Sequence, residues 1–303
     1  MPYSTHGLSA ETIALLTEAG LRQLDVESLA VRALQEDVDG GVDVTTVATV
    51  PMEQRGRLAL VARGGGVVAG LVVARAIFDV VCGDDMTCDV SVEEGSHVEP
   101  GTELMAVTSS THNLLRAERP ALNAVSHLSG IATATRAWVA AVANTDAGIR
   151  DTRKTTAGLR GVEKYAVRVG GGLNHRMNLA DAALVKDNHV EALGGVDEAF
   201  RAVRRAFPEI PIEVEVDTLE QLDVAIDAGA DLILLDNFSV EEMAEAVRRT
   251  SGRALLEASG GLTLDQAAAV AATGVDYLAV GALTHSSPVL DIGADLTVVS
   301  EES

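Results

Sequence analysis

The stretch Ile212–Asp236 reads IEVEVDTLEQLDVAIDAGADLILLD and holds one complete strand–helix–strand unit. Two short apolar segments, Ile212–Val216 and Leu232–Leu235, have the length and composition of buried strands. Between them, Leu219–Ala228 has the periodicity of an amphipathic helix, and Gly229 is a helix-ending signal. A unit of this length predicts two parallel strands joined by a right-handed crossover.

The same rhythm repeats over the second half of the chain. Further strands are expected at Ile149–Arg153, Ala183–Lys186, Ala254–Glu257 and Tyr277–Val280. Further helices are expected at Val196–Phe207, Val240–Thr250 and Leu264–Ala272, with Gly252 and Gly274 as ending signals. Repeated units of this kind predict a parallel sheet, either closed as a barrel or open and doubly wound.

Polar residues follow the predicted strands. They are Arg153–Lys154, Lys186–Asp187, Glu215–Asp217, Asp236–Asn237, Ser259–Gly261 and Gly281. A barrel gathers such residues around its whole mouth, whereas an open sheet gathers them at one switch point. Helix capping explains Asp217 but not Lys186 or Glu215. We therefore favour the barrel and expect Lys186, Glu215 and Asp236 to point into one mouth.

The first part of the chain, up to about Ser110, has the pattern of strands and turns. Gly56–Val73 is rich in Val, Leu and Gly, and Met86–Val92 alternates as a half-buried strand. Leu114–Ala143 then has helical periodicity, with Pro120 early in it, where proline can open or kink a helix. We expect the junction between two domains in this helical segment.

Composition argues against several classes of function. The 303 residues carry a formal net charge of −22 and only 3% aromatic residues, whereas a nucleic-acid binder needs a cationic face and aromatic platforms. The most membrane-like segment, Val67–Cys82, is interrupted by Arg75 and Asp79 and is too short to span a bilayer. No secretory signal is visible at the N-terminus, and the two cysteines fit a reducing compartment. We expect a cytoplasmic protein that binds neither nucleic acid nor membrane.

Positive charge is concentrated in one window, residues 150–186. The window holds eight Arg or Lys against Asp151, Glu163 and Asp181, a balance of +5 within an acidic chain. A negative protein must concentrate cations locally in order to attract an anionic substrate. A solvated helix face explains the same charges, and composition alone does not separate the two interpretations.

Ordered motifs along nearly the whole chain resemble one enzyme family. DTRKTTAGLR at Asp151–Arg160, the run Lys164–Asp181 and LVKDNH at Leu184–His189 resemble the quinolinate phosphoribosyltransferases. The similarity continues through Glu213–Asp217, Leu234–Phe238, Glu257–Gly261 and Val275–Ala282, and Glu36–Asp37 with Asp43–Thr46 resembles the family's opening motif. Each motif is short, but the ordered set is specific. One departure is Ala157, where the family more often has proline.

This resemblance implies a fold and a reaction. The fold is α/β, with an N-terminal α/β sandwich over residues 1–120, an incomplete TIM-like βα barrel over 121–287, and a tail, 288–303, that returns to the sandwich. The reaction joins quinolinate to the phosphoribosyl group of phosphoribosyl pyrophosphate (PRPP). It releases pyrophosphate and CO₂ and gives nicotinate mononucleotide for NAD biosynthesis. The resemblance also implies Mg²⁺ as the cofactor and a homodimer or higher oligomer with shared active sites.

The resemblance assigns roles to individual residues. The two carboxylates of quinolinate would be bound by Arg119, Arg153, His175, Arg176 and Lys186, with Thr152 also in the substrate site and Arg119 contributed by a neighbouring subunit. The catalytic set would be Lys154 between the two substrates, with Glu215 and Asp236 holding the ribose hydroxyls and the water shell of Mg²⁺. Ser259, Gly260, Gly261 and Gly281 would offer backbone N–H groups to a phosphate. Guanidinium groups suit this task because they bind carboxylates bidentately.

Two other functions fit parts of the sequence. A nicotinate or nicotinamide phosphoribosyltransferase would catalyse the transfer without decarboxylation, but it needs fewer cations around the ring. A non-catalytic barrel that senses phosphorylated ligands would gain nothing from the acids Glu215 and Asp236 at strand ends. An assay with each pyridine acid distinguishes the three functions.

Overall fold

The computed structural model describes residues 5–299 and divides into two compact units. Unit 1 comprises Met1–Ala134, Thr156–Gly170 and Ser286–Ser303, and unit 2 comprises Thr135–Thr155 and Gly171–His285. The domain boundary expected at residue 120 falls inside a long helix, α5 (Thr111–Ala141). Residues 156–170, expected in the barrel domain, belong to unit 1.

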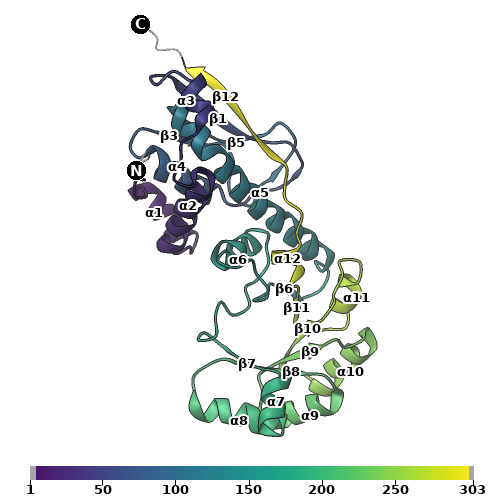
Figure 1. Cartoon of the computed structure of the whole chain (residues 1–303). Helices are drawn as coiled ribbons and strands as arrows, with labels where there is room; N and C mark the ends of the chain where they lie inside the picture. The colour runs from purple at the N-terminus through teal and green to yellow at the C-terminus, as the bar shows by residue number, and fades with distance from the viewer. Residues whose placement is uncertain (1–4, 300–303) are drawn as a thin grey trace. The chain divides into compact units, whose positions relative to one another are not determined.

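Unit 1 is built on a four-stranded antiparallel sheet with strand order β12-β1-β5-β3 (Figure 1). The strands are β1 Arg55–Ala62, β3 Thr87–Val90, β5 Glu103–Ser110 and β12 Ile292–Val299, and the short strands β2 Gly66–Val67 and β4 His97–Val98 pair separately. β12 pairs with β1 along its whole length. The tail expected to return to the first domain therefore lies beside β1 as far as Val299, and residues 300–303 lie outside the described part.

Helices make up much of unit 1, which the expectation of strands and turns up to Ser110 missed. They are α1 Ala10–Glu18, α2 Gln23–Val38, α3 Val44–Thr49, α4 Leu71–Cys82, α6 Arg160–Val169 and the greater part of α5. The Val-, Leu- and Gly-rich run is strand β1 as far as Ala62 and contains the two-residue strand β2 after it. Gly70, with φ of 93°, then begins α4, because glycine adopts this left-handed conformation at little cost.

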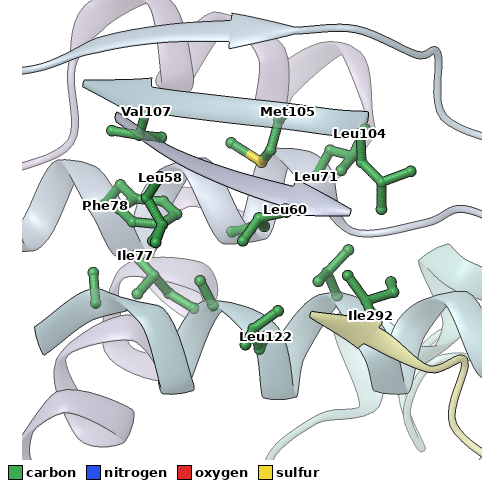
Figure 2. Close-up of a cluster of buried hydrophobic side chains, with 14 of the residues drawn as sticks. Leu58, Leu60, Leu71, Ile77, Phe78, Leu104, Met105, Val107, Leu122 and Ile292 are labelled. Atoms are coloured by element: carbon green, nitrogen blue, oxygen red, sulfur yellow. The ribbon is translucent and has the colours of Figure 1, made fainter. Parts of the chain in front are cut away.

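The membrane-like run of the sequence is a core helix, α4, and every one of its residues is buried. Figure 2 shows its side chains meeting those of β1, β5, β12 and α5 in one apolar cluster. The two charges in α4 are compensated by the segment that opens α1. Arg75 lies 2.6 Å from Glu11, and Asp79 accepts the backbone and hydroxyl hydrogens of Ser9 at 2.9 and 2.8 Å. Across residues 5–299, no helix combines the length and apolarity needed to cross a membrane.

Unit 2 carries a six-stranded parallel sheet with strand order β6-β11-β10-β9-β8-β7. The strands are β6 Gly148–Arg150, β7 Ala183–Val185, β8 Ile212–Val216, β9 Leu232–Asp236, β10 Leu255–Ser259 and β11 Tyr277–Ala279. β6 and β7 are the two ends of this order and do not pair within the described chain. The expected α/β class is confirmed, with the barrel left incomplete between its first and second strands.

Helices connect the strands of unit 2 from β7 to β11, and a final helix, α12, follows β11. They are α7 Asp187–Leu193, α8 Val196–Ala206, α9 Leu219–Ala228, α10 Val240–Thr250, α11 Ala267–Ala271 and α12 Ala282–His285. The register pairs Ser259 with Asp236 and Ala279 with Arg150. Because the strands are parallel, their carboxyl ends and the polar residues that follow them lie at one edge of the sheet.

Candidate active site

The carboxyl ends of the unit 2 strands surround a pocket of about 400 Å³. Most of the substrate and catalytic residues expected from the sequence line it: Thr152, Arg153, Lys154, His175, Arg176, Lys186, Glu215, Asp236 and Ser259. Leu184, Leu234, Glu257 and Ala279 complete the lining. The expectation that Lys186, Glu215 and Asp236 converge on one mouth is therefore confirmed.

Four expected site residues are not in this lining. Arg119 is exposed on α5 in unit 1. Gly260 and Gly261 follow β10 with φ of +99° and +58°, and a Cβ on Gly260 would lie 2.2 Å from Asn237 Oδ1, so that turn requires glycine. Gly281 lies against the site, because a Cβ there would be 3.0 Å from Lys154 Cδ.

The two arginines of the pocket have open hydrogen-bond donors. The Nε atoms of Arg153 and Arg176 are both buried and have no hydrogen-bond partner. Burial lowers the pKa of Arg176, and repulsion from Arg153 lowers it further. A buried donor without a partner is costly, and so is a cation removed from water. An anionic ligand would relieve both costs.

The ring of His175 is fully engaged by its neighbours. Its Nδ1 accepts the backbone N–H of Arg176 at 2.7 Å, so the ring proton is on Nε2, which lies 2.7 Å from Glu213 Oε2. Asp151 accepts the backbone N–H of His175 at 2.8 Å. In this arrangement, His175 fixes the backbone of Arg176, and neither ring nitrogen is open to a ligand.

A second buried carboxylate, that of Glu257, lies near the His175 ring. Glu257 is fully buried, and Arg150 Nη1 donates to its Oε2 at 2.6 Å. Burial and repulsion from Glu213 raise the pKa of Glu257 to about 7. The ligand atoms of His175, Glu213 and Glu257 lie within 4.8 Å of one another, a spacing that can suit a metal ion. Arg150 already supplies a cation to this group, so we assign no metal to it.

The mouth of the pocket also contains the carboxylates of Glu215 and Asp236. Lys186 Nζ lies 2.5 Å from Glu215 Oε2, so the lysine expected to bind quinolinate is paired with an acid of the site. Asp236 accepts the side-chain N–H of Asn237 at 2.7 Å. Burial raises the pKa of Asp236, and repulsion from Asp217 raises it further. These carboxylates offer oxygen ligands where a cation would be favourable.

Two family models match the chain. The N-terminal domain of quinolinate phosphoribosyl transferase matches residues 43–129, and its C-terminal domain matches residues 131–295. The chain belongs to the quinolinate phosphoribosyltransferase family. It is 56% identical over 269 residues to the nicotinate-nucleotide pyrophosphorylase [carboxylating] of Mycobacterium leprae (strain TN), covering 88% of this chain and 95% of that protein.

Other members of the family agree in sequence and structure. A probable nicotinate-nucleotide pyrophosphorylase [carboxylating] of Bacillus subtilis (strain 168) is 38% identical over 93% of this chain and 96% of its own. The NadC structure from Streptococcus pyogenes superposes with a TM-score of 0.88 at 37% identity, covering 92% of this chain and 99% of that one. The resemblance drawn from the ordered motifs is confirmed.

Sequence reasoning about this quinolinate phosphoribosyltransferase family member gave no role to Glu213, Glu257 or Asp151. The signal for Glu213 was present in β8, where it alternates with Glu215. Residues two apart in a strand face the same side, so a strand with Glu215 at the pocket also directs Glu213 inward. A buried acid in each of two strands of this sheet, β8 and β10, then predicts a cationic partner, and Arg150 is that partner for Glu257.

Proposed function

We infer that the protein transfers the phosphoribosyl group of PRPP to quinolinate, with loss of pyrophosphate and CO₂. The observation that carries this inference is the pair of buried Nε donors without partners, on Arg153 and Arg176, in one pocket. Two guanidinium groups suit a ring with two adjacent carboxylates, because each can bind one carboxylate bidentately. A monoacid such as nicotinate would leave one of them without a counter-charge.

The proposed chemistry depends on position and charge. The ring nitrogen of quinolinate attacks the anomeric carbon, and pyrophosphate leaves from a cationic, ribose-centred transition state. Lys154 stabilises the negative charge that develops on the leaving group. The new N–ribose bond makes the ring nitrogen a pyridinium cation. CO₂ then leaves from the adjacent ring carbon, and the electron pair of the broken bond stays on that carbon, where the positive nitrogen stabilises it. Protonation of this ring carbon gives nicotinate mononucleotide. Arg153 and Arg176 hold the ring in place through both steps.

We also propose that Mg²⁺ enters this site with PRPP. The support is chemical: Asp236 and Glu215 offer carboxylate oxygens, the ligands Mg²⁺ prefers, and the pKa of Asp236 is raised by burial and by Asp217 even though Lys186 and Lys154 lower it. When bound, the ion would neutralise pyrophosphate charge. Lys186 would have to release Glu215 for that carboxylate to serve.

The activity is tested by incubating the purified protein with PRPP and Mg²⁺, with and without a chelator. Quinolinate and nicotinate are supplied separately, and pyrophosphate and CO₂ are measured. Pyrophosphate and CO₂ in equal amounts, from quinolinate alone, are the expected result. Equal activity with nicotinate would contradict the proposed substrate. Activity that survives chelation would contradict the proposed metal.

We further propose a homodimer, or a higher oligomer, in which each site takes Arg119 from a partner. The support is that Arg119 is exposed on α5 and is not among the residues that line the pocket, although the family resemblance gives it a substrate role. The test mixes inactive Arg119→Ala and Lys186→Ala proteins and lets their subunits exchange. Random exchange should restore roughly a quarter of wild-type activity, because each hybrid dimer has one intact site. Inactivity after confirmed exchange would contradict shared sites.

The cytoplasm is the proposed compartment. Both cysteines, Cys82 and Cys88, are free, and burial raises the pKa of each thiol to about 11. Free thiols are typical of a reducing environment. Cell fractionation with an antibody against the protein tests the proposal, and recovery in an oxidising compartment would contradict it.

A further inference from the structure

Lys154 lies in a segment without helix or strand, between β6 and α6, and it is exposed. Within residues 5–299, its ammonium group forms no hydrogen bond or ion pair, although Asp236 is near enough to feel its charge. A lysine side chain is long and flexible and gains no fixed position from its own geometry. The placement of this cation over the pocket therefore depends on what holds its backbone.

The backbone of Lys154 is held on both sides by threonine hydroxyls. Its N–H donates to Thr152 Oγ1 at 2.9 Å, and its carbonyl accepts from Thr284 Oγ1 at 2.9 Å. Thr284 lies on α12 and is only 1% exposed. One threonine is local to the loop, whereas the other is 130 residues away in the sequence. Thr284 is thus the long-range anchor of this loop.

The direction of the Thr284 hydroxyl follows from its surroundings. The oxygen also lies 3.2 Å from the carbonyl of Gly281, which is farther than the 2.9 Å to the carbonyl of Lys154. A hydroxyl has one hydrogen to donate. The shorter contact, to Lys154, takes that hydrogen.

Gly281 completes the arrangement. A Cβ on Gly281 would lie 3.0 Å from Lys154 Cδ and 3.4 Å from Thr152 Oγ1, so the lysine stem rests against the glycine backbone. These contacts join the loop after β6 to the turn after β11. The two strands are neighbours, with Ala279 opposite Arg150.

We propose that Thr284 is a positioning residue, whose buried hydroxyl holds Lys154 where it can act on the phosphates of PRPP. This inference rests on the proposed function, because it gives Lys154 the role proposed above. It predicts that catalytic activity depends on the hydroxyl of Thr284 and not on its methyl group. It also predicts that Thr284 acts only through Lys154.

The first test compares Thr284→Val with Thr284→Ser. Valine keeps the volume and removes the hydrogen bond, whereas serine keeps the bond. For T284V we expect kcat to fall about tenfold, the KM for PRPP to rise and quinolinate binding to stay within about twofold of wild type. T284S should stay within about threefold of wild type. Thr273→Val is a matched control, because that hydroxyl also donates to a backbone carbonyl, Val270 O, but outside the pocket lining.

The second test is a double-mutant cycle. Adding T284V to Lys154→Ala should lower activity by less than about twofold, because the group that Thr284 positions is already absent. A further tenfold loss would overturn the inference, as would wild-type kinetics of T284V. If T284V fails to fold, as judged by its unfolding midpoint, Thr284→Ala takes its place with the same expectations.

The cycle also separates this inference from the proposed function. Loss of activity in K154A together with normal T284V kinetics would overturn the role of Thr284 alone. Full activity of K154A would overturn the role of Lys154 and, with it, the inference. No pyrophosphate release by the wild-type protein would overturn the proposed function itself.

Discussion

The two units differ in whether their buried polar side chains have hydrogen-bond partners. In unit 1, buried Arg75 and Asp79 each have a partner on the segment that opens α1, and fully buried Glu163 accepts from His127 at 2.9 Å. In unit 2, buried side-chain atoms without a hydrogen-bond partner gather at or beside the pocket. They belong to Arg153, Arg176, Glu213 and Glu257, and Thr250 is a further example that the structure does not explain. Among residues 5–299, every buried side-chain atom without a partner belongs to unit 2, and most of these atoms lie where a ligand would bind.

The largest expected effect concerns Glu257. Its pKa is raised from 4.5 to about 7, so the folded state holds the proton more tightly than the unfolded state. The stabilisation is present below about pH 4.5 and is lost as the pH rises through about 7. Relative to Glu257→Gln, the wild-type free energy of unfolding should fall by about 3 kcal/mol over this window. Urea unfolding of both proteins between about pH 4.5 and about pH 7 measures this change in the unfolding free energy.

A constant difference between the two proteins would contradict this prediction. It would mean that Arg150 keeps Glu257 ionised throughout, and that unit 2 pairs its buried charges as well as unit 1 does. The opposite slope would have the same meaning, because a carboxylate stabilised by its partner loses stability as the pH falls.

The next effect tests the open donors of the pocket. Arg153→Ala and Arg176→Ala should each remove a charged contact worth roughly 1.5–3 kcal/mol, which lowers kcat/KM for quinolinate about 10- to 150-fold. Arg63→Ala in unit 1 is the control, because that arginine is exposed and paired with Asp295. Steady-state kinetics with saturating PRPP measures the change. A loss of less than threefold in both pocket variants would remove the basis for the diacid site.

Substitution of a buried charge in unit 1 should lower the stability of the protein and leave its catalytic activity unchanged. Asp79→Ala leaves the backbone N–H of Ser9 without its partner, which should cost about 1–3 kcal/mol of unfolding free energy. Asp84→Ala, an exposed neighbour, should cost less than about 0.5 kcal/mol. Denaturant unfolding gives both values, and activity per folded molecule should be unchanged. A kinetic defect in folded Asp79→Ala protein would contradict the view that the buried charges of unit 1 contribute to stability alone.

The smallest effect is an ordinary helix cap in unit 2. Ser239 Oγ accepts the backbone N–H of Glu242, and the Glu242 carboxylate accepts the backbone N–H of Ser239. Ser239→Ala should cost about 1 kcal/mol, and Ser239→Asp should restore most of it. Thermal unfolding measures both. Equal melting temperatures for all three proteins would show that the cap contributes nothing.

Sequence reasoning succeeded where local signals agreed. The bounds of β8, α9 and α10 match the expectation, because Thr218 and Ser239 cap the two helices and Gly229 ends α9. Polar residues at strand ends also located most of the pocket, since parallel strands must bring those ends together.

Prediction from the sequence was less successful where contacts between distant residues determine the structure. Pro120 was expected to open or kink a helix, and it lies inside α5, nine residues after Thr111, so it does not open that helix. The run at 67–82 has two charges four residues apart, Arg75 and Asp79, which periodicity would place on an exposed helix face, yet both are buried in α4. The tautomer of His175 depends on the local backbone conformation, which directs the N–H of Arg176 to Nδ1, and on Glu213 of β8, which is distant in the sequence.

The pairing of β12 with β1 has a consequence for how the protein is made. Arg55 and Val299 are register partners, so the sheet of unit 1 joins early and very late parts of the chain. During synthesis the ribosome releases β1 long before β12, and the edge of β1 stays open while all of unit 2 emerges. Unit 2 can therefore fold first, although its sequence comes second. Until β12 emerges, the open edge of β1 is the part of unit 1 most exposed to pairing with a wrong strand.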